Sequence, residues 1–417
     1  MSIIFPNFFR DRLIGVVALL TIQVFSSMAF SQSDQNGVVH RQQSLPEVRR
    51  VGWSIPLPEE TKVSTSTEDD LLLLSDSTGV HGLHLSSGLP AWPVGENDFG
   101  YLLQSIFAPE KSNSKPSAGT VHKIRGSTYW TAVVPGTSLG TRLTPLELVS
   151  LNLTAQGRLE WRQSSEELMN EQNWSFASAP LVKGDEVFIL LHHPQKGWRC
   201  AALNSSGNRI WSHPVLNLQG DFDTVQLQKS GASLFVITGQ NAIELIIHDS
   251  IIRERLFEVA SSSNDRGTLE TLVTETHLVR LCGSQLDIWE RTGGTLLFSR
   301  VLPVHLTFLW GETQGNMILS GKSLMAMDVN SGKETWRLAP ASPGLQGVGR
   351  GVMMNGSLLW PTGDELWQIG LAAGEIEKRI PLRQLTGIHG GDLMLLKNSL
   401  LIHRSDSISL LELVQPR

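Results

Sequence analysis

The chain has 417 residues, of which 41% are hydrophobic and 18% are charged, and this balance excludes a disordered, charge-rich protein. The formal net charge of -6 comes from 34 basic and 40 acidic residues, so the composition lacks the basic bias of a nucleic-acid-binding protein. The two cysteines, Cys200 and Cys282, do not have the spacing of a metal site. We interpret both as small residues of the core, while a disulfide bond between them stays open.

The N-terminal segment has the organisation of a secretory signal peptide. Arg10 and Arg12 precede an apolar run over residues 13–25, and small residues follow this run. The run is shorter than the about 18–20 apolar residues that span a membrane. We therefore predict a signal peptide over residues 1–31, a flexible leader over 32–50, and a periplasmic or secreted protein without a transmembrane span. An uncleaved N-terminal anchor is the alternative.

A short unit recurs along the rest of the chain: an alternating apolar and polar strand, a turn with glycine, and an aromatic residue four positions after the glycine. The alternation is typical of a half-buried strand, and the glycine supplies the positive φ of a tight hairpin. The aromatic side chain opens the next strand, where we expect it to be buried between neighbouring units. The successive copies contain Gly88 and Trp92, Gly157 and Trp161, Gly207 and Trp211, Gly294 and Phe298, Gly332 and Trp336, and finally Gly374, which Lys378 follows in place of the aromatic.

One further copy, between the third and the fourth of these, is incomplete because it has no glycine and carries Phe257 in the aromatic position. The first two copies are 69 residues apart and the second and third are 50 apart, and the later copies indicate a period near 40–45 residues, the length of a four-stranded propeller blade. We predict an all-β, eight-bladed β-propeller of four-stranded antiparallel blades over residues 51–415. Seven blades come from the copies. Trp53 marks an N-terminal strand that completes the last, C-terminal blade and hides its edge.

The repeat resembles a known blade motif. Its clearest copy is MAMDVNSGKETW at residues 325–336, with Asp328, Gly332 and Trp336 at the motif positions. This pattern is similar to the pyrroloquinoline-quinone (PQQ)-like repeat of quinoprotein dehydrogenases, which also occurs in the non-catalytic propeller subunit of the outer-membrane β-barrel assembly machinery. The resemblance implies the blade architecture. It leaves the function open, because fold does not fix activity.

The enzymes of this class bind PQQ and calcium in the central funnel, often beneath adjacent cysteines, and this sequence has no adjacent cysteine pair. Other candidate ligands are scattered. Asp221 and Asp223 offer carboxylates for calcium, but we interpret them as part of a polar turn. Two histidine pairs stand on predicted strands, His81 with His84 and His192 with His193, and the odd spacing within each pair directs the two side chains to opposite faces. The acidic run from Glu68 to Asp70 precedes a predicted strand, and we interpret it as the solvated start of that strand. We predict no catalytic, cofactor-binding or metal-binding residue.

These observations favour a non-catalytic binding or scaffolding propeller in the cell envelope, a monomer that contacts an unidentified protein partner and no nucleic acid. The alternatives are a PQQ- or metal-dependent oxidoreductase and a ligand sensor that uses the central channel. Two connecting segments are candidate partner surfaces, residues 105–128 and 162–178. The second carries Trp174 beside three glutamates, Glu166, Glu167 and Glu171. It is interpreted either as a contact patch or as a solvated connector with an inward tryptophan.

Overall fold

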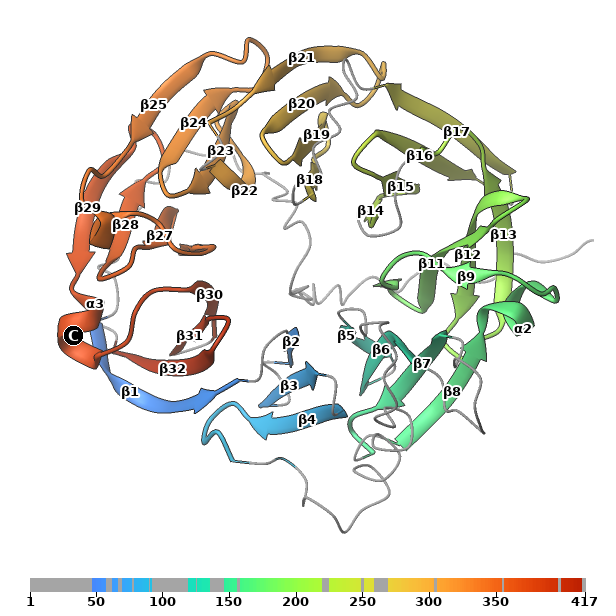
Figure 1. Ribbon diagram of the computed structural model, residues 1–417, viewed down its shortest axis with the longest axis horizontal. Coiled ribbons are helices and arrows are strands. Elements are labelled where there is room, and N and C mark those ends of the chain that lie inside the picture. The colour runs from blue at the N-terminus through green and yellow to red at the C-terminus, as the bar shows by residue number, and fades with distance from the viewer. Residues whose placement is uncertain are drawn as a thin grey trace, which may run out of the picture.

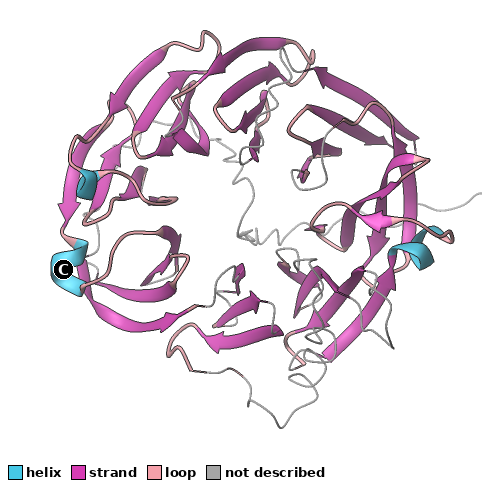
Figure 2. Ribbon diagram, in the orientation of Figure 1, coloured by secondary structure: helices cyan, strands magenta, loops and turns pink. Residues whose placement is uncertain are grey.

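The computed structural model shows a ring of β-sheets arranged around a central axis (Figure 1). Strands dominate the ring, and the helices are short and lie at its periphery (Figure 2). The structure describes residues 47–57, 62–66, 70–76, 79–89, 91, 119–124, 126–135, 146–155, 158–219, 225–248, 251–258, 269–303, 306–354, 356–396 and 399–414. In these ranges no helix is long and apolar enough to cross a membrane.

Each sheet is an antiparallel meander whose first strand lies at the channel and whose last strand lies at the outside. The first sheet contains β2 (Lys62–Ser66), β3 (Leu71–Asp76) and β4 (Gly79–His84). Blade 2 contains β5 (Thr120–Ile124), β6 (Ser127–Pro135), β7 (Leu146–Asn152) and β8 (Arg158–Ser164). Blade 3 contains β9 (Ser175–Phe176), β10 (Leu181–Lys183), β11 (Glu186–His193), β12 (Gly197–Asn204) and β13 (Arg209–Val215). Blade 4 contains β14 (Gln226–Ser230), β15 (Ser233–Ile237), β16 (Asn241–His248) and β17 (Ile251–Glu258).

The second half of the ring continues the same pattern. Blade 5 contains β18 (Leu269–Val273), β19 (His277–Cys282), β20 (Gln285–Glu290) and β21 (Leu296–Val301). Blade 6 contains β22 (Leu306–Thr313), β23 (Asn316–Gly321), β24 (Leu324–Asp328) and β25 (Glu334–Leu338). Blade 7 contains β26 (Val352–Met354), β27 (Ser357–Pro361), β28 (Leu366–Gly370) and β29 (Glu375–Ile380). The closing blade contains β30 (Asp392–Leu395), β31 (Ser399–His403), β32 (Ser407–Val414) and β1 (Glu47–Pro56). In the part of the chain that the structure describes, the helices are α2 (Ser165–Met169), the 3-10 turn η2 (Pro343–Leu345) and α3 (Leu382–Thr386).

The prediction of eight four-stranded blades is wrong, because seven blades are complete and the described part of the first sheet has three strands. Beyond its turn at Gly88, two backbone hydrogen bonds continue the pairing: His84 donates to the Leu89 carbonyl and Ala91 donates to the Gly82 carbonyl. Pro90 follows the turn almost at once, and proline has no N–H for a strand ladder. Trp92, where the fourth strand was expected, lies outside the described residues.

The ring closes as the sequence predicts. Strand β1 pairs antiparallel with β32, so that Trp53 stands opposite Leu410 and Ile55 opposite Ile408, and the two strands lie side by side in Figure 1. The strand begins at Glu47, inside the predicted leader. Pairing the two ends of the chain in one sheet removes the exposed edge that an open ring would present.

The repeated aromatic residues join neighbouring blades. The indole of Trp161 covers Gly207 of the next blade, and its Nε1 donates a 2.8 Å hydrogen bond to the Ser205 carbonyl. Trp53 and Trp336 make the equivalent contact: they cover Gly88 and Gly374 and donate to the Leu85 and Leu371 carbonyls, respectively. A Cβ on Gly207 would lie 2.7 Å from the indole, so the glycine leaves the space that the tryptophan fills. We call this arrangement the tryptophan–glycine dock.

Partial burial is common to the docking aromatics in the described part of the chain, since Trp53, Trp161, Trp211, Phe298 and Trp336 are all intermediate in exposure. Phe298 covers Gly332 without an N–H to donate. Trp211 instead packs beside Phe188 of its own blade, with ring centroids 6.1 Å apart. Gly157 lies outside the described residues.

The incomplete copy forms blade 4, but Phe257 does not occupy the aromatic position of the dock. The residue above Gly294 is Arg255, and its Nη1 donates a 2.6 Å hydrogen bond to the Arg291 carbonyl. Its methylene groups therefore replace the indole surface and its guanidinium replaces the indole N–H. Phe257 is fully buried deeper in the same interface, against Trp289. Arg255 and Phe257 are two positions apart, so both project from the same face of β17.

The core consists of apolar clusters between successive blades. Cys200 in β12 and Cys282 in β19 are both buried, so their interpretation as small core residues is confirmed. The deepest tryptophans are not those of the repeat motif. They are Trp130, Trp289, Trp360 and Trp367, each at most 2% exposed.

Candidate functional site

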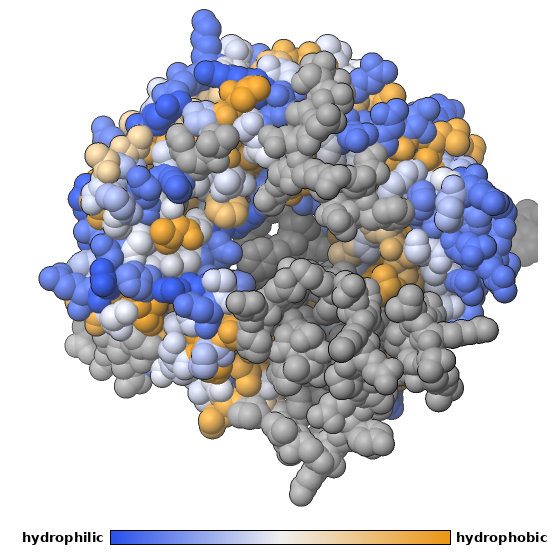
Figure 3. Space-filling model, in the orientation of Figure 1, coloured by the Kyte–Doolittle hydropathy of each residue, from blue (hydrophilic) through white to orange (hydrophobic). Residues whose placement is uncertain are grey.

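The channel end of blades 5 to 7 and of the closing blade is organised around one arginine, Arg350. Residue 350 lies two positions before the start of β26, the innermost strand of blade 7. A narrow opening is visible at the centre of the ring (Figure 3). Charged residues on the inner strands near this axis are the natural candidates for a binding or catalytic site.

Two glycines fix the backbone of Arg350. A Cβ on Gly349 would overlap the backbone of Gly391, and a Cβ on Gly351 would overlap the carbonyl of Leu359. Gly349 therefore lets the segment pack on the start of β30, and Gly351 lets it pack on β27. Arg350 N donates a 2.7 Å hydrogen bond to Asp392 Oδ1, and Leu393 N donates a 2.7 Å bond to the Arg350 carbonyl.

The side chain of Arg350 then crosses blade 6. Its guanidinium carbon lies 5.2 Å from the centroid of the Phe308 ring in β22, in the geometry of a cation–π contact. Beyond the ring, Nη2 forms a hydrogen-bonded ion pair with Glu270 in β18 of blade 5. One residue thus contacts the inner strands of blade 5, blade 6 and the closing blade.

The electrostatics of this cluster are dominated by burial. Burial raises the pKa of the Glu270 carboxyl above its usual value, and the Arg350 guanidinium opposes that shift. A backbone N–H from Leu309 also favours the ionised form, whereas the negative charge of Asp392 disfavours it. The Glu270 side chain is 15% exposed and that of Arg350 is 27% exposed. The positive charge of Arg350 therefore favours the ionised form of Glu270, which has lost much of its stabilisation by water.

Further side-chain hydrogen bonds between neighbouring inner strands extend this cluster, and we call the whole set the inner girdle. Between blades 4 and 5, Gln228 Nε2 donates to the Thr271 carbonyl at 2.9 Å and Gln226 Nε2 donates to the Leu269 carbonyl at 2.6 Å. Thr65 of the first sheet donates to the sulfur of Met394 in the closing blade. These bonds tie one blade to the next around the channel.

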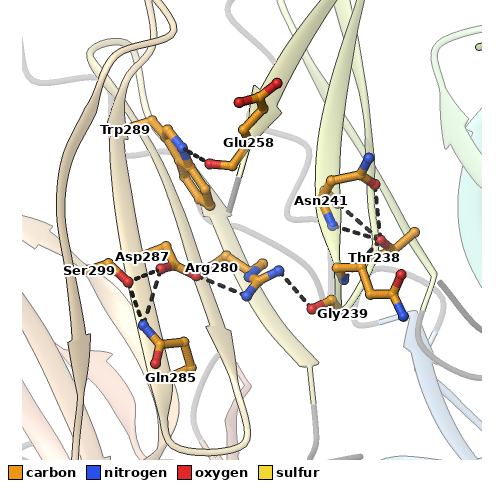
Figure 4. Close-up of polar contacts among 10 residues, drawn as sticks. Thr238, Gly239, Asn241, Glu258, Arg280, Gln285, Asp287, Trp289 and Ser299 are labelled. Atoms are coloured by element: carbon orange, nitrogen blue, oxygen red, sulfur yellow. Dashed lines mark hydrogen bonds and ion pairs between the residues drawn. The ribbon is translucent and has the colours of Figure 1, made fainter. Parts of the chain in front are cut away.

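A second charged cluster is closed to solvent and lies between blades 4 and 5 (Figure 4). Arg280 and Asp287 form an ion pair at 2.9 Å, and both side chains are 0% exposed. Arg280 Nη1 donates to the carbonyl of Gly239 in blade 4, and Ser299 Oγ donates to Asp287. The pair therefore holds two blades together and is not open to a ligand.

The same interface contains a further buried acid, Glu244. Its side chain is 4% exposed and lies 3.3 Å from Arg255 and 3.8 Å from Arg291. Arg291 also donates to Ser230 and to the Thr274 carbonyl. Ion pairs thus supplement the arginine dock at the junction where the repeat motif is incomplete.

The donor set described in the structure does not fit PQQ with calcium. Calcium takes about 6–8 oxygen ligands, mainly from carboxylates and carbonyls. Glu270 and Asp392 instead accept hydrogen bonds from the side chain and the backbone of Arg350. No group of three or more His, Cys, Asp or Glu residues suited to a metal occurs in the described ranges. Cys200 and Cys282 lie in different blades, so they do not form an adjacent pair.

The structure places the other residues singled out from the sequence as follows. Asp221 and Asp223 lie outside the described residues, as do Glu68 and Asp69. Asp70 accepts hydrogen bonds from Ser86 at the turn of the first sheet. His84 lies 3.6 Å from Asp70, and His81 stands in the same strand, β4. His193 is buried and accepts a hydrogen bond from the backbone of Gln195, while His192 packs on Trp198.

The two candidate partner segments have different outcomes. Much of segment 105–128 lies outside the described residues, which resume at residue 119. In segment 162–178, Trp174 is 6% exposed, and its Nε1 donates to Glu171. The interpretation as a connector with an inward tryptophan is confirmed. A capping box between Ser164 and Glu167 starts the short helix α2 of this connector.

Comparison with known proteins places this architecture in one class of folds. No family model and no curated protein matches the chain. Its solved neighbours show that the chain has the fold of the PQQ-like β-propellers. BamB from Moraxella catarrhalis is similar over 88% of this chain and 99% of its own, with 16% identity and a TM-score of 0.51.

Two dehydrogenases are similar to the same degree. A quinohemoprotein alcohol dehydrogenase from Comamonas testosteroni has 13% identity and a TM-score of 0.52, over 93% of this chain and 79% of its own. A europium-containing methanol dehydrogenase has 12% identity and a TM-score of 0.50, over 85% of this chain and 84% of its own. At these identities the likeness establishes the fold, and the function must be argued from the residues.

Proposed function

We propose that the protein is a non-catalytic binding or scaffolding propeller of the cell envelope, which takes part in protein–protein interaction. The observation that carries this proposal is the inner girdle. A catalytic centre needs reactive groups that converge on a substrate position. Here the charged groups bond to one another: Arg350 contacts Glu270 and Asp392. Their hydrogen bonds and ion pair connect inner strands and stabilise the ring.

The repeat motif supports the proposal without deciding it. The same motif occurs in a non-catalytic envelope propeller and in quinoprotein dehydrogenases, and the fold is equally similar to both kinds of protein. The alternative is therefore a PQQ- or metal-dependent oxidoreductase or a channel ligand sensor. The donor set at the channel favours the scaffold, because its carboxylates already have partners within the protein.

The discriminating experiment adds PQQ and calcium to the purified protein. We expect no saturable change in thermal stability and no dye-linked oxidation of alcohols or sugars, with a known quinoprotein dehydrogenase as the positive control. A parallel pull-down from envelope extracts is expected to recover a reproducible protein partner. Saturable PQQ binding with turnover would establish the alternative and remove the scaffold proposal.

Export is the second part of the proposal. The predicted signal peptide lies outside the described residues, so its support is the sequence pattern of residues 1–31. Mass spectrometry of the mature protein from the envelope fraction should place the N-terminus at about residue 32, the position that follows the small residues of the cleavage region. Recovery of intact Met1 in the cytosolic fraction would contradict export.

A further inference from the structure

A pocket of about 270 Å³ opens between blades 2 and 3, away from the channel. The hairpin turn between β5 and β6 and the start of β8 supply one wall, and the turn between β12 and β13 supplies the other. Its lining includes Ser127, Tyr129, Glu160, Trp161, Ser205 and Ser206. Hydroxyl groups, one carboxylate and two aromatic rings therefore meet in a space that two blades enclose.

The carboxylate of this pocket is held in place. Glu160 Oε1 accepts a 2.8 Å hydrogen bond from Arg158 Nη2 and a 2.9 Å bond from Asn152 Nδ2. These bonds keep the pKa of Glu160 below its usual value, so the group is ionised at neutral pH. Arg158 is largely solvated and balances this charge locally. The walls thus present an oriented acceptor without a net charge.

The aromatic walls are fixed as well. Trp161 is locked by its docking on Gly207 and by its hydrogen bond to the Ser205 carbonyl. The Tyr129 ring stacks on His122 with ring centroids 5.8 Å apart and an interplanar angle of 21°. Burial lowers the pKa of His122 to about 4, so this neighbour is neutral. Rigid aromatic surfaces bind a ligand without the entropic cost of ordering them.

We propose that this pocket binds one pyranose ring of a neutral saccharide. A sugar offers hydroxyls that both donate and accept, which match the serine and tyrosine hydroxyls and the Glu160 carboxylate. Its C–H face packs on an aromatic ring. An anion would meet Glu160, and a cation would gain less from this carboxylate because Arg158 already pairs with it. An apolar ligand would leave the polar lining unpaired. The volume is below the about 300–1,000 Å³ of pockets for drug-sized ligands, which suits a single ring.

The test is a calorimetric titration of the purified protein with D-glucose, N-acetyl-D-glucosamine and the β-1,4-linked tetramer of each. We expect saturable binding of at least one probe, with a dissociation constant on the order of 1 mM for a single ring. Tighter binding of a tetramer would identify a glycan chain as the source of the ring, whereas equal affinity would identify a free sugar. Absence of saturable binding for all four probes would overturn the proposal.

Two variants and a matched control locate the binding. Ser206→Tyr fills the pocket from an exposed turn and should abolish binding, whereas Tyr129→Phe removes one hydroxyl and should weaken binding about threefold to tenfold. Ala373→Tyr adds the same side chain at the equivalent exposed turn position, directly before Gly374, and should leave binding unchanged. Undiminished binding by folded Ser206→Tyr and Tyr129→Phe proteins would overturn the assignment. Because the readout needs no partner protein, the result is independent of the scaffold proposal.

Discussion

At the scale of single residues, Arg350 shows how local backbone geometry creates a long-range contact. Gly349 lets its backbone lie against the start of β30 and Gly351 lets it lie against β27, and its side chain then reaches Phe308 and Glu270. The partially buried carboxylate of Glu270 depends on this single cation. Removal of one member of a buried ion pair leaves an uncompensated charge, which costs more than the pair contributes.

Arg350→Ala should therefore lower the free energy of unfolding by about 2–4 kcal/mol, near the lower part of the range for buried pairs because the arginine is partly exposed. Glu270→Gln in the Arg350→Ala background should restore part of this loss, since it removes the orphaned charge. Denaturant unfolding measures both effects. The control is Arg383→Ala at the exposed pair with Asp364, where about 0–1 kcal/mol is expected. Equal losses at the two sites would contradict the role of Arg350.

The raised pKa of Glu270 also gives stability a defined pH dependence. The folded protein binds the Glu270 proton more tightly than the unfolded chain does, so this group favours folding at acidic pH. That contribution is full below the ordinary glutamate pKa and is lost as the pH rises through the higher folded pKa. The stability of the wild type relative to Glu270→Gln should therefore fall over the interval that starts at the ordinary glutamate pKa of about 4.3 and extends upward through the raised pKa. A difference that stays constant over this interval would contradict the assigned direction of the shift.

At the scale of elements, the same contact at the blade junctions is made by different types of side chain. Tryptophan, phenylalanine and arginine each cover a turn glycine of the next blade. Trp336 and Arg255 also donate to the carbonyl three residues before that glycine. The arginine solution occurs where buried Glu244 supplies a counter-charge.

The glycine of a dock is required for space as well as for conformation. Gly374 has φ +69°, and a Cβ there would overlap the Trp336 ring. Gly356 has φ +80°, and a Cβ there would meet nothing within 4 Å. Both Gly→Ala changes carry the strain of a left-handed backbone, about 1–2 kcal/mol. Gly374→Ala should cost at least about 1 kcal/mol more, because overpacking adds to the strain. Similar unfolding midpoints for the two variants would show that the dock tolerates the methyl group.

The sequence predicts the blades well because each is encoded locally. The strand, the glycine turn and the aromatic residue of one copy lie within about 12 residues. The strands of a blade pair with neighbours in sequence, so the blade can be predicted without knowledge of distant contacts. The predicted count fails at the first sheet, whose described part has three strands. The copy there was identified from Gly88 and Trp92, and Trp92 lies outside the described residues. Arg255 was missed because the incomplete copy was aligned on its aromatic residue and not on its register opposite Glu244.

The cluster around Arg350 was not predicted, because its members stand far apart in the chain. Glu270, Phe308, Arg350 and Asp392 meet only when four inner strands surround one axis. The sequence contains one usable signal, the run Gly349-Arg350-Gly351, in which glycines flank a charged residue. Such spacing indicates close backbone approach, and a propeller provides that approach at its channel.

At the scale of the whole molecule, the pairing of β1 with β32 determines whether the ring is closed. Without β1, the N–H and carbonyl groups along one edge of β32 would be exposed to other chains. A protein that starts at residue 58 should therefore be less stable and should aggregate. A protein that starts at residue 47 retains the strand and should behave as the full chain does. Size-exclusion chromatography and thermal unfolding distinguish the two, and a monodisperse, equally stable shorter protein would show that β1 is dispensable.

The same pairing has a consequence for the order of folding. Ser54 and Ser409, whose hydroxyls lie 2.8 Å apart across the two strands, are separated by 355 positions in the chain. Contacts of such high sequence separation form slowly, because the entropy lost in closing the loop precedes the favourable free energy of the contact. The strand made first during synthesis must therefore wait, unpaired, until the strand made last is available. The first sheet and blades 2 to 7 can form by local hairpin pairing in this interval, and the closing blade is the kinetic checkpoint at which an open arc becomes a ring.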